Sequence, residues 1–287
     1  MKATTTRVKK AIKYQRWRLR RLAVQQKYGK QLSQSVPVIF GNSLPKAGSH
    51  LLIQILWGMA KLGPFVINGM SSVNRDEFNR NVSVERILDN IKQLKPGDIS
   101  YGKLNCKEPF IEPLTRPGMA TIYMFRDPRD VAVSVIRYAT EMHLEHGLNK
   151  HFTEVLKRDE ERLRFVITGS DIPSLPYKSI YTRYKNHIGW LDQPVLCIKF
   201  EDMIEDRRNT LGRVLDFVAE KGYTPSVSRQ DAVAVLEKAI QPKRSGTFRK
   251  GKTGEWRTVF SPAIKQLFKD TTGDLLQQLG YEQDADW

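Results

Sequence analysis

A short apolar strand that runs into a loop and then a helix occurs three times in this chain of 287 residues. The predicted strands are rich in β-branched and aromatic residues and cover Val36–Phe40, Ala120–Phe125 and Val195–Phe200. Helices are predicted after them at His50–Leu62, about Asp127–Met142 and about Glu205–Lys221. Strands that each lead into a helix favour a parallel sheet covered on both faces. We therefore expect a single α/β domain with a central, mostly parallel sheet flanked by helices.

The N-terminal 33 residues differ in charge from the rest of the chain. The formal net charge is +16, no Asp or Glu precedes Asp76, and Lys and Arg are dense from Lys2 to Lys30. We predict a basic arm or amphipathic helix over residues 1–33 and one domain over residues 34–287. Three interpretations of the arm stay open: a solvated arm or a helix packed on the domain, contact with an anionic membrane, or contact with an acidic polymer.

Composition narrows the class of protein. No apolar stretch is long enough to span a membrane, and no apolar segment follows the basic N-terminus as in a secretory signal. Cys106 and Cys197 are too few for a disulfide framework and fit a reducing compartment. We expect a cytoplasmic protein that binds no metal and no specific nucleic acid, because neither a metal-ligand pattern nor a nucleic-acid recognition motif is found.

The loop before the first predicted helix combines groups that bind phosphate or sulfate. Gly48 lets the backbone come close to an anion, and Lys46 supplies a cation. Ser49 and His50 can donate side-chain hydrogen bonds at the start of the helix. The loop is not a Walker A motif, because Gly-Lys-Ser/Thr is absent, and an ordinary nucleotide kinase is disfavoured. Taken alone, the loop predicts only an anion-binding turn.

Two further cationic segments lie far downstream. Arg126 follows a predicted strand, where open α/β sheets bind ligands, and its guanidinium can grip a phosphate with two hydrogen bonds. Ser134 lies about two helical turns beyond it. Arg249, Lys250 and Gly251 form a second cationic loop near the C-terminus. Without a ligand, Arg126 would cap or pair within its helix, and the later loop would be a solvated basic run.

Four segments, in this order along the chain, resemble motifs of the sulfotransferases that use 3′-phosphoadenosine-5′-phosphosulfate (PAPS). They are Pro45–Leu51, Phe125–Ser134, Phe200–Met203 and Phe248–Trp256. They resemble, in turn, the family's 5′-phosphosulfate loop, its 3′-phosphate motif, the Tyr-Glu-Asp end of a strand, and the Arg-Lys-Gly-x-x-Gly-Asp-Trp signature. The resemblance covers most of the chain and implies a P-loop-like sulfotransferase fold with PAPS as co-substrate.

The resemblance also implies roles for single residues. Lys46 would act beside the leaving group, and Lys103 stands where many members of the family have a catalytic His. The residues implied to bind the donor are Lys46, Ala47, Gly48, Ser49, His50, Arg126, Ser134, Phe200, Phe248, Arg249, Lys250 and Gly251.

The identity of the base stays open. An ordinary Lys is protonated at neutral pH, but burial and nearby cations can lower its pKa enough for Lys103 to accept a proton. Alternatively, Lys103 binds the sulfate and Glu108 or Glu77 is the base. If no efficient base exists, the chain is a catalytically impaired, sulfotransferase-like nucleotide-binding protein. The acceptor class (glycan, lipid or small molecule) is not assigned, and the basic charge favours an anionic acceptor.

Overall fold

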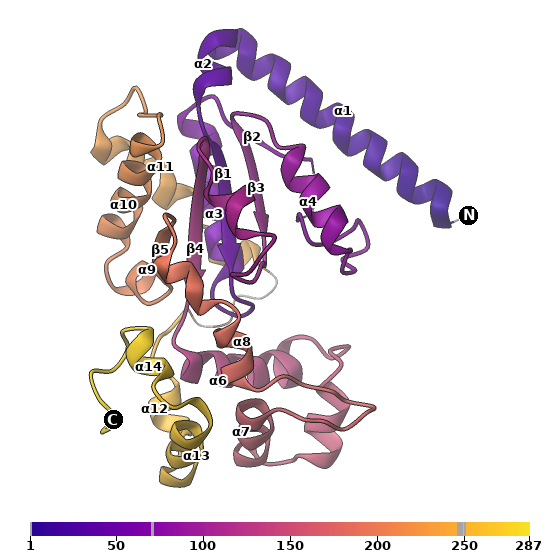
Figure 1. Ribbon diagram of the computed structural model, residues 1–287, viewed down its shortest axis with the longest axis vertical. Coiled ribbons are helices and arrows are strands. Elements are labelled where there is room, and N and C mark those ends of the chain that lie inside the picture. Colours follow the sequence, from indigo (N-terminus) through magenta and orange to yellow (C-terminus); the bar gives the residue numbers. More distant parts are fainter. Residues whose placement is uncertain (1, 70–71, 246–248, 250) are drawn as a thin grey trace.

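The computed structural model describes residues 2–69, 72–245, 249 and 251–287. A five-stranded sheet lies at its centre, formed by β1 (Val38–Ser43), β2 (Val66–Ile67), β3 (Asp98–Gly102), β4 (Met119–Phe125) and β5 (Leu196–Lys199). The strand order is β2-β3-β1-β4-β5, and all neighbouring strands are parallel. The predicted single α/β domain with a parallel sheet is confirmed (Figure 1). Because β1 is central, the loop that follows it lies between the ends of β3 and β4.

Helices cover both faces of the sheet, since the central strands β1 and β4 are buried along their whole length. The core on one face joins the sheet to α3 (Ser49–Leu62), α10 (Arg207–Glu220) and α11 (Arg229–Ala239). The core on the other face joins it to α4 (Val84–Lys92), α5 (Ile111–Thr115), α6 (Pro128–Arg137) and α7 (Asp159–Thr168). Burial on both sides explains why the predicted strands are continuous apolar runs.

The other elements that follow β1 in the chain are short, apart from α13. They are η1 (Tyr138–Met142), η2 (His151–Val155), α8 (Ile180–Lys185), η3 (Ile188–Asp192), α9 (Asp202–Glu205), η4 (Pro242–Arg244), α12 (Trp256–Val259), α13 (Pro262–Thr272) and α14 (Leu275–Gln278). In Figure 1, helices α6 to α8 and α12 to α14 gather below the sheet, beyond the carboxyl ends of its strands.

The structure corrects three predicted boundaries. Strand β1 continues to Ser43, beyond the predicted end at Phe40, because its last residues pair with β4 as far as Met124. Helix α6 ends at Arg137 and is followed by the π-helical turn η1, so the predicted helix to Met142 changes its hydrogen bonding in the last turn. The helix predicted over about 205–221 is α10, which begins at Arg207 and ends at Glu220, and the separate short helix α9 precedes it.

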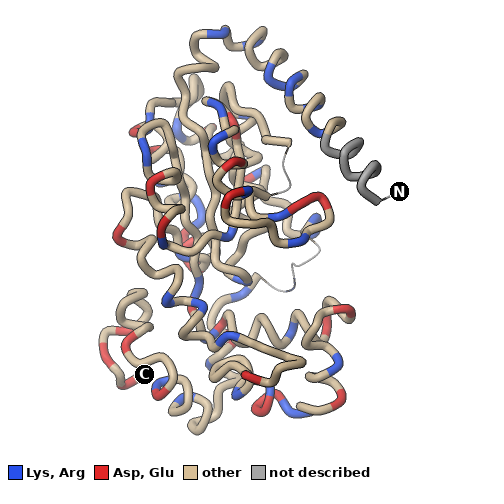
Figure 2. Tube along the Cα trace, turned by 45° about the vertical axis from the view of Figure 1, so that its right-hand side comes forward, with Lys and Arg blue, Asp and Glu red and all other residues tan. Residues whose placement is uncertain are grey.

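The basic N-terminus forms one long helix, α1 (Lys2–Tyr28), followed by the short α2 (Lys30–Ser35). Trp17 is buried, and its indole Nε1 donates a hydrogen bond of 2.8 Å to Asp98 Oδ1 at the start of β3. Arg21 forms an ion pair of 2.9 Å with the same carboxylate. These contacts fasten α1 to the domain, while Lys and Arg are spread along the helix (Figure 2). No helix within the described ranges is both long and apolar enough to cross a membrane.

Candidate functional site

The loop between β1 and α3 has a backbone that only particular residues tolerate. Lys46 and Gly48 adopt left-handed conformations with φ of 71° and 87°. A Cβ atom on Gly48 would lie 2.6 Å from the Phe200 ring and 3.0 Å from the sulfur of Met124. Position 48 therefore requires glycine for two independent reasons, one conformational and one steric.

This loop also presents hydrogen-bond donors at the start of a long helix. The Ala47 N–H donates to Leu44 O at 3.2 Å, which closes the turn before α3. Ser43 Oγ donates to Ser49 Oγ at 2.7 Å, and Ser49 is the first residue of α3. The first N–H groups of the helix carry a partial positive charge, so an anion is stabilised here.

Three strand ends bring the predicted cations to one edge of the sheet. Lys103 follows β3, the Lys46 loop follows β1, and Arg126 follows β4. Asn42 locks two of these ends together: its Nδ2 donates to Leu104 O at 2.9 Å, and Leu104 N donates to Asn42 Oδ1 at 2.8 Å. Segments that lie far apart in the sequence thus meet because parallel strands end at the same edge.

The amine of Lys46 is strongly perturbed by its surroundings. Its Nζ lies 3.5 Å from the centre of the Tyr138 ring. Burial, followed by the charges of Lys103 and Arg126, lowers the pKa of Lys46 to about 7. Burial and the charges of Lys103 and Lys46 also lower the pKa of His50. Positive groups that destabilise one another in this way would be stabilised by a bound anion.

Lys103 is exposed, but surrounding protein atoms displace part of the water around its amine. This desolvation and the charge of Arg75 lower the pKa of Lys103. The backbone N–H of Lys103 donates to Asn74 Oδ1 at 3.1 Å, which ties the residue to the loop after β2. The fraction of neutral Lys103 at neutral pH is therefore larger than for an ordinary lysine.

Arg126 is held by several partners and keeps one buried donor unused. Its guanidinium lies 4.5 Å from the centre of the Phe200 ring, and its Nη2 donates to Lys252 O at 3.1 Å. The Tyr184 hydroxyl donates to Arg126 O at 2.7 Å. Among the described residues, the buried Arg126 Nε has no hydrogen-bond partner, and Glu201 Oε1 lies 3.9 Å from it. An unpaired buried donor is costly, and a phosphate oxygen fits it chemically.

The C-terminal loop, residues 249 and 251–256, is anchored to α6 by one carboxylate. Asp130 accepts hydrogen bonds from Gly254 N at 2.8 Å and from Trp256 N at 3.1 Å, and it pairs with Arg126 at 3.4 Å. Ser134 lies one helical turn beyond Asp130 and is half-buried. The loop, Arg126 and Ser134 therefore share one side of α6.

Within this loop, Arg249 pairs with Glu255, and Gly251 adopts a φ of 58°. Phe248 and Lys250, which the resemblance also implies in donor binding, lie outside the described residues.

Sequence reasoning did not assign roles to Asp130, Tyr138 and Tyr184. Asp130 was visible as the second Asp of the Phe125–Ser134 motif, but the two backbone N–H groups that donate to it are more than 120 residues away in the chain. The carboxylates considered as a base lie in different places: Glu77 lines a cavity between α1 and α4, and Glu108 is exposed. The identity of the base stays a prediction.

Neither metal nor thiol chemistry is indicated in the described part of the chain. No three His, Cys, Asp or Glu side chains gather there as a metal ion would require. Burial raises the pKa of Cys106 to about 11 and that of Cys197 to about 12, so both remain thiols at neutral pH.

Residues 39–280 match the family model of the sulfotransferase domain. The chain belongs to the sulfotransferase family. Mouse sulfotransferase 1E1 is 23% identical over 79% of this chain and 79% of its own length. A 3-alpha-hydroxysteroid sulfotransferase of Cavia porcellus is 24% identical over 51% of this chain and 52% of its own length. The family that the four motifs indicated is thus confirmed.

Solved sulfotransferase-like structures share the fold. The structure of mouse sulfotransferase SULT7A1 complexed with PAP aligns with a TM-score of 0.59 at 17% identity, covering 86% of this chain and 87% of that one. Retinol dehydratase in complex with androsterone and inactive cofactor PAP aligns with a TM-score of 0.56 at 16% identity, covering 86% and 83%. These similarities establish the fold.

Proposed function

We propose that this sulfotransferase-family protein transfers the sulfuryl group of PAPS to a hydroxyl or amine of an acceptor. One observation carries the proposal: three cationic segments, far apart in the sequence, converge at the carboxyl edge of the sheet. They are the Lys46 loop, Arg126 and the C-terminal loop. The similar structures of SULT7A1 and retinol dehydratase contain PAP, the product that PAPS leaves after transfer.

The donor would be held at both of its charged ends. The backbone of Ala47, Gly48 and Ser49, together with the side chains of Lys46 and His50, would bind the 5′-phosphosulfate at the start of α3. Arg126, Ser134, Arg249, Lys250 and Gly251 would bind the 3′-phosphate. The Arg126 Nε, which has no hydrogen-bond partner among the described residues, and the left-handed turn at Gly48 before α3 support this arrangement. Phe200 packs against both segments, and Phe248 would lie next to the nucleotide.

Chemistry at this site would depend on charge stabilisation. Bound PAPS supplies an activated sulfuryl group, and its sulfur–oxygen bond to the 5′-phosphate breaks as the acceptor oxygen or nitrogen forms a new bond to sulfur. The protonated amine of Lys46 would stabilise the negative charge on the leaving phosphate oxygen. Lys103, whose pKa is lowered, would take the acceptor's proton in its neutral form.

Two alternatives stay open. Glu77 or Glu108 would serve as base if Lys103 instead bound the sulfate. The chain would be a catalytically impaired, sulfotransferase-like nucleotide-binding protein if no group accepted the proton. The variant Lys103→Met distinguishes Lys103 as base from Lys103 as sulfate ligand. If Lys103 is the base, the variant should lose transfer activity and keep its PAP affinity. If Lys103 binds the sulfate, the variant should also show a higher KM for PAPS.

The first test is calorimetry with PAP, followed by transfer of radiolabelled sulfate to a panel of phenols, glycosides and lipids. Lys46→Ala should abolish transfer and also weaken PAP binding, because it removes a cation beside the phosphate, and Arg126→Ala should weaken PAP binding by about tenfold or more. Lys238→Ala removes one positive charge from the exposed face of α11 and is the matched control. Folded protein that binds no PAP would refute both the enzyme and the nucleotide-binding alternative.

A further inference from the structure

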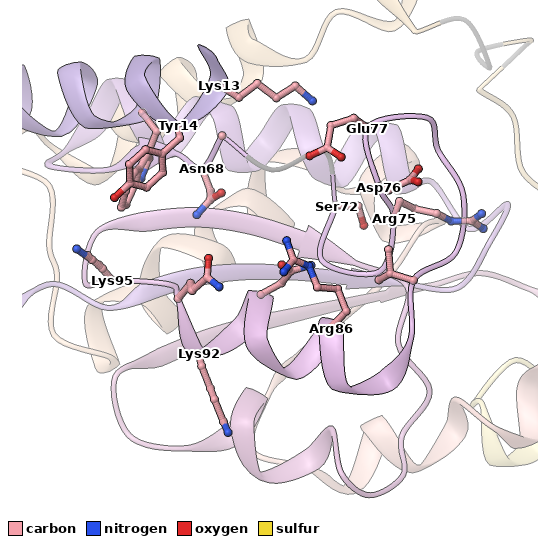
Figure 3. A pocket seen from close by; sticks show the side chains of 15 residues that line it. Lys13, Tyr14, Asn68, Ser72, Arg75, Asp76, Glu77, Arg86, Lys92 and Lys95 are labelled. Carbon is pink, nitrogen blue, oxygen red and sulfur yellow. The ribbon is translucent and has the colours of Figure 1, made fainter. Parts of the chain in front are cut away.

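A cavity of about 430 Å³ lies between α1, α4 and the loop that follows β2 (Figure 3). Trp17 and Tyr14 of α1 form its aromatic side, and Asn90 of α4 and Ser72 line it from the domain. The match to the sulfotransferase domain begins at residue 39, so α1 lies outside the family domain and adds a wall of its own. A cavity of this size accommodates a small organic molecule.

One wall of the cavity is bonded directly to the strand end that carries Lys103. Val73 N donates to Tyr101 O at 3.0 Å, and the N–H of Lys103 donates to Asn74 Oδ1 at 3.1 Å. The next residue, Arg75, lines the cavity and is close enough for its charge to act on Lys103. The Arg75 end of the cavity is therefore next to the strand end that carries Lys103.

Cations outnumber anions around the cavity. Its lining includes five cationic side chains and two carboxylates: Lys13, Arg75, Arg86, Lys92 and Lys95, and Asp76 and Glu77. The charge of Asp76 is compensated by an ion pair of 2.6 Å with Arg80. Figure 3 shows Arg86 extending from α4 into the cavity, with Lys13 on α1 across from it, whereas Lys92 points away. In the part of the chain that the structure describes, no ion pair compensates Arg86.

We propose that this cavity is the acceptor site and that it selects a small hydroxyl-bearing organic anion. The anionic group would lie beside Arg86, and the hydroxyl would reach the Arg75 end, next to Lys103. Trp17 and Tyr14 would cover the apolar or sugar-ring part of the molecule. This inference rests on the proposed sulfotransferase function, because it assigns the acceptor of the same site.

Matched acceptor pairs test the selection: phenyl glucuronide against phenyl glucoside, and 4-hydroxybenzoate against 4-hydroxybenzyl alcohol. Radiolabelled sulfate transfer should give the anionic member a kcat/KM on the order of tenfold higher. Arg86→Ala should bring the ratio of the two kcat/KM values close to one, because it raises the KM for the anionic member. The same variant should leave the PAP affinity and the kcat/KM for the neutral member unchanged. Lys92→Ala, on the same helix but pointing away, should keep the wild-type ratio.

A wild-type ratio of one or less, or an Arg86→Ala ratio equal to that of wild type, would overturn the acceptor assignment. If PAP binds but no compound is sulfated, the affinities of the same acceptor pairs for the PAP complex, measured by calorimetry, test the acceptor assignment instead. There, equal or absent binding of the anionic members refutes the assignment. Failure to bind PAP at all would instead refute the proposed function, so the two failures are distinguishable.

The outer face of α1 supports a second, independent inference. Ile12, Leu19 and Leu22 are 46%, 65% and 59% exposed. At 100° per residue they lie about 140–220° around the helix from the buried Trp17, on the side that faces away from the domain. Arg16 and Arg18 flank this apolar stripe on its two sides, and no acidic residue occurs in the helix.

We infer that α1 lies on an anionic lipid bilayer, with Leu19 and Leu22 in the apolar boundary and the flanking arginines at the headgroups. Apolar side chains between cations match the charge of such a surface, and both contributions strengthen binding. The opposite face of α1 carries Trp17, which contacts the domain and lines the cavity. Membrane contact through the outer face therefore leaves the cavity in place.

Co-sedimentation of the full chain with vesicles tests this. It should bind mixed phosphatidylcholine–phosphatidylserine vesicles and not phosphatidylcholine alone. The double variant Leu19→Gln/Leu22→Gln should bind these vesicles with an affinity at least about tenfold below that of wild type. Leu144→Gln/Val155→Gln changes two side chains that are 71% and 62% exposed elsewhere and should bind like wild type. Equal binding by both double variants, or no binding by wild type, would refute the inference. The inference would also be refuted if sedimentation velocity showed that the wild-type chain is a dimer and that only the α1 double variant is a monomer, because the apolar stripe would then bind a second copy of the chain.

Discussion

Raising the pH from 7 to 9 should weaken PAP binding, because the amine of Lys46 loses its proton in this range. Burial and the charges of Lys103 and Arg126 lower its pKa to about 7 in the ligand-free protein. A phosphate beside the amine favours the charged form, so binding must return a proton to any neutral Lys46. Phosphate groups ionise near pH 6 and therefore stay charged throughout the range.

The size of the effect follows from linkage. If the complex keeps Lys46 protonated, the Kd is inversely proportional to the fraction of protonated amine in the free protein and rises roughly fiftyfold between pH 7 and pH 9. This corresponds to about 2.3 kcal/mol. Below about pH 6, Lys46 is largely charged, and the contribution of this group to the Kd becomes flat. Proton uptake on binding should be about one half at pH 7 and close to one at pH 8.5.

Calorimetry in two buffers of different ionisation enthalpy measures both the Kd and the proton uptake. Lys46→Arg is the matched control, since a guanidinium stays charged over the whole range. Its Kd should vary much less with pH, whatever its absolute value. Equal pH slopes for wild type and Lys46→Arg, or no proton uptake by wild type at pH 8.5, would refute the assignment of Lys46 to the phosphate site.

Three further predictions concern the parts that hold the site together. Gly48→Ala should lower the free energy of unfolding by about 1–3 kcal/mol in urea titrations, because of its positive φ and the Phe200 ring 2.6 Å from the new Cβ. Asp130→Ala should weaken PAP binding about tenfold in calorimetry, since the C-terminal loop loses the acceptor of two backbone hydrogen bonds. Trp17→Ala should expose α1 to limited proteolysis while leaving PAP affinity unchanged, because this buried side chain joins the helix to Asp98.

Each of these has a clear contrary result. Unchanged stability of Gly48→Ala would mean that the loop relaxes without contact with Phe200. Wild-type PAP affinity in Asp130→Ala would separate the C-terminal loop from donor binding. A protease-resistant α1 in Trp17→Ala would show that other contacts fix the helix, and a second variant, Asp98→Asn, would then be expected to behave like wild type.

The central strands and the phosphate loop were predictable from the sequence because their causes are local. Apolar β-branched runs such as Ala120–Phe125 have few other stable arrangements than a buried strand. Gly48 between a strand and a helix indicates a close backbone turn whatever surrounds it. Lys46 and Arg126 were identified for a related reason, since each follows a strand and belongs to a recognisable motif.

The tertiary structure decided what these residues experience. The pKa of Lys46 depends on Tyr138, Lys103 and Arg126, which are brought together by strand order and not by sequence separation. Asp130 acquires its role from a loop more than 120 residues later. The orientation of α1 was also hidden, because cations surround the helix and its apolar residues fall on two opposite sides. The contacts of Trp17 and Arg21 with Asp98 determine which side meets the domain and which is left for a partner.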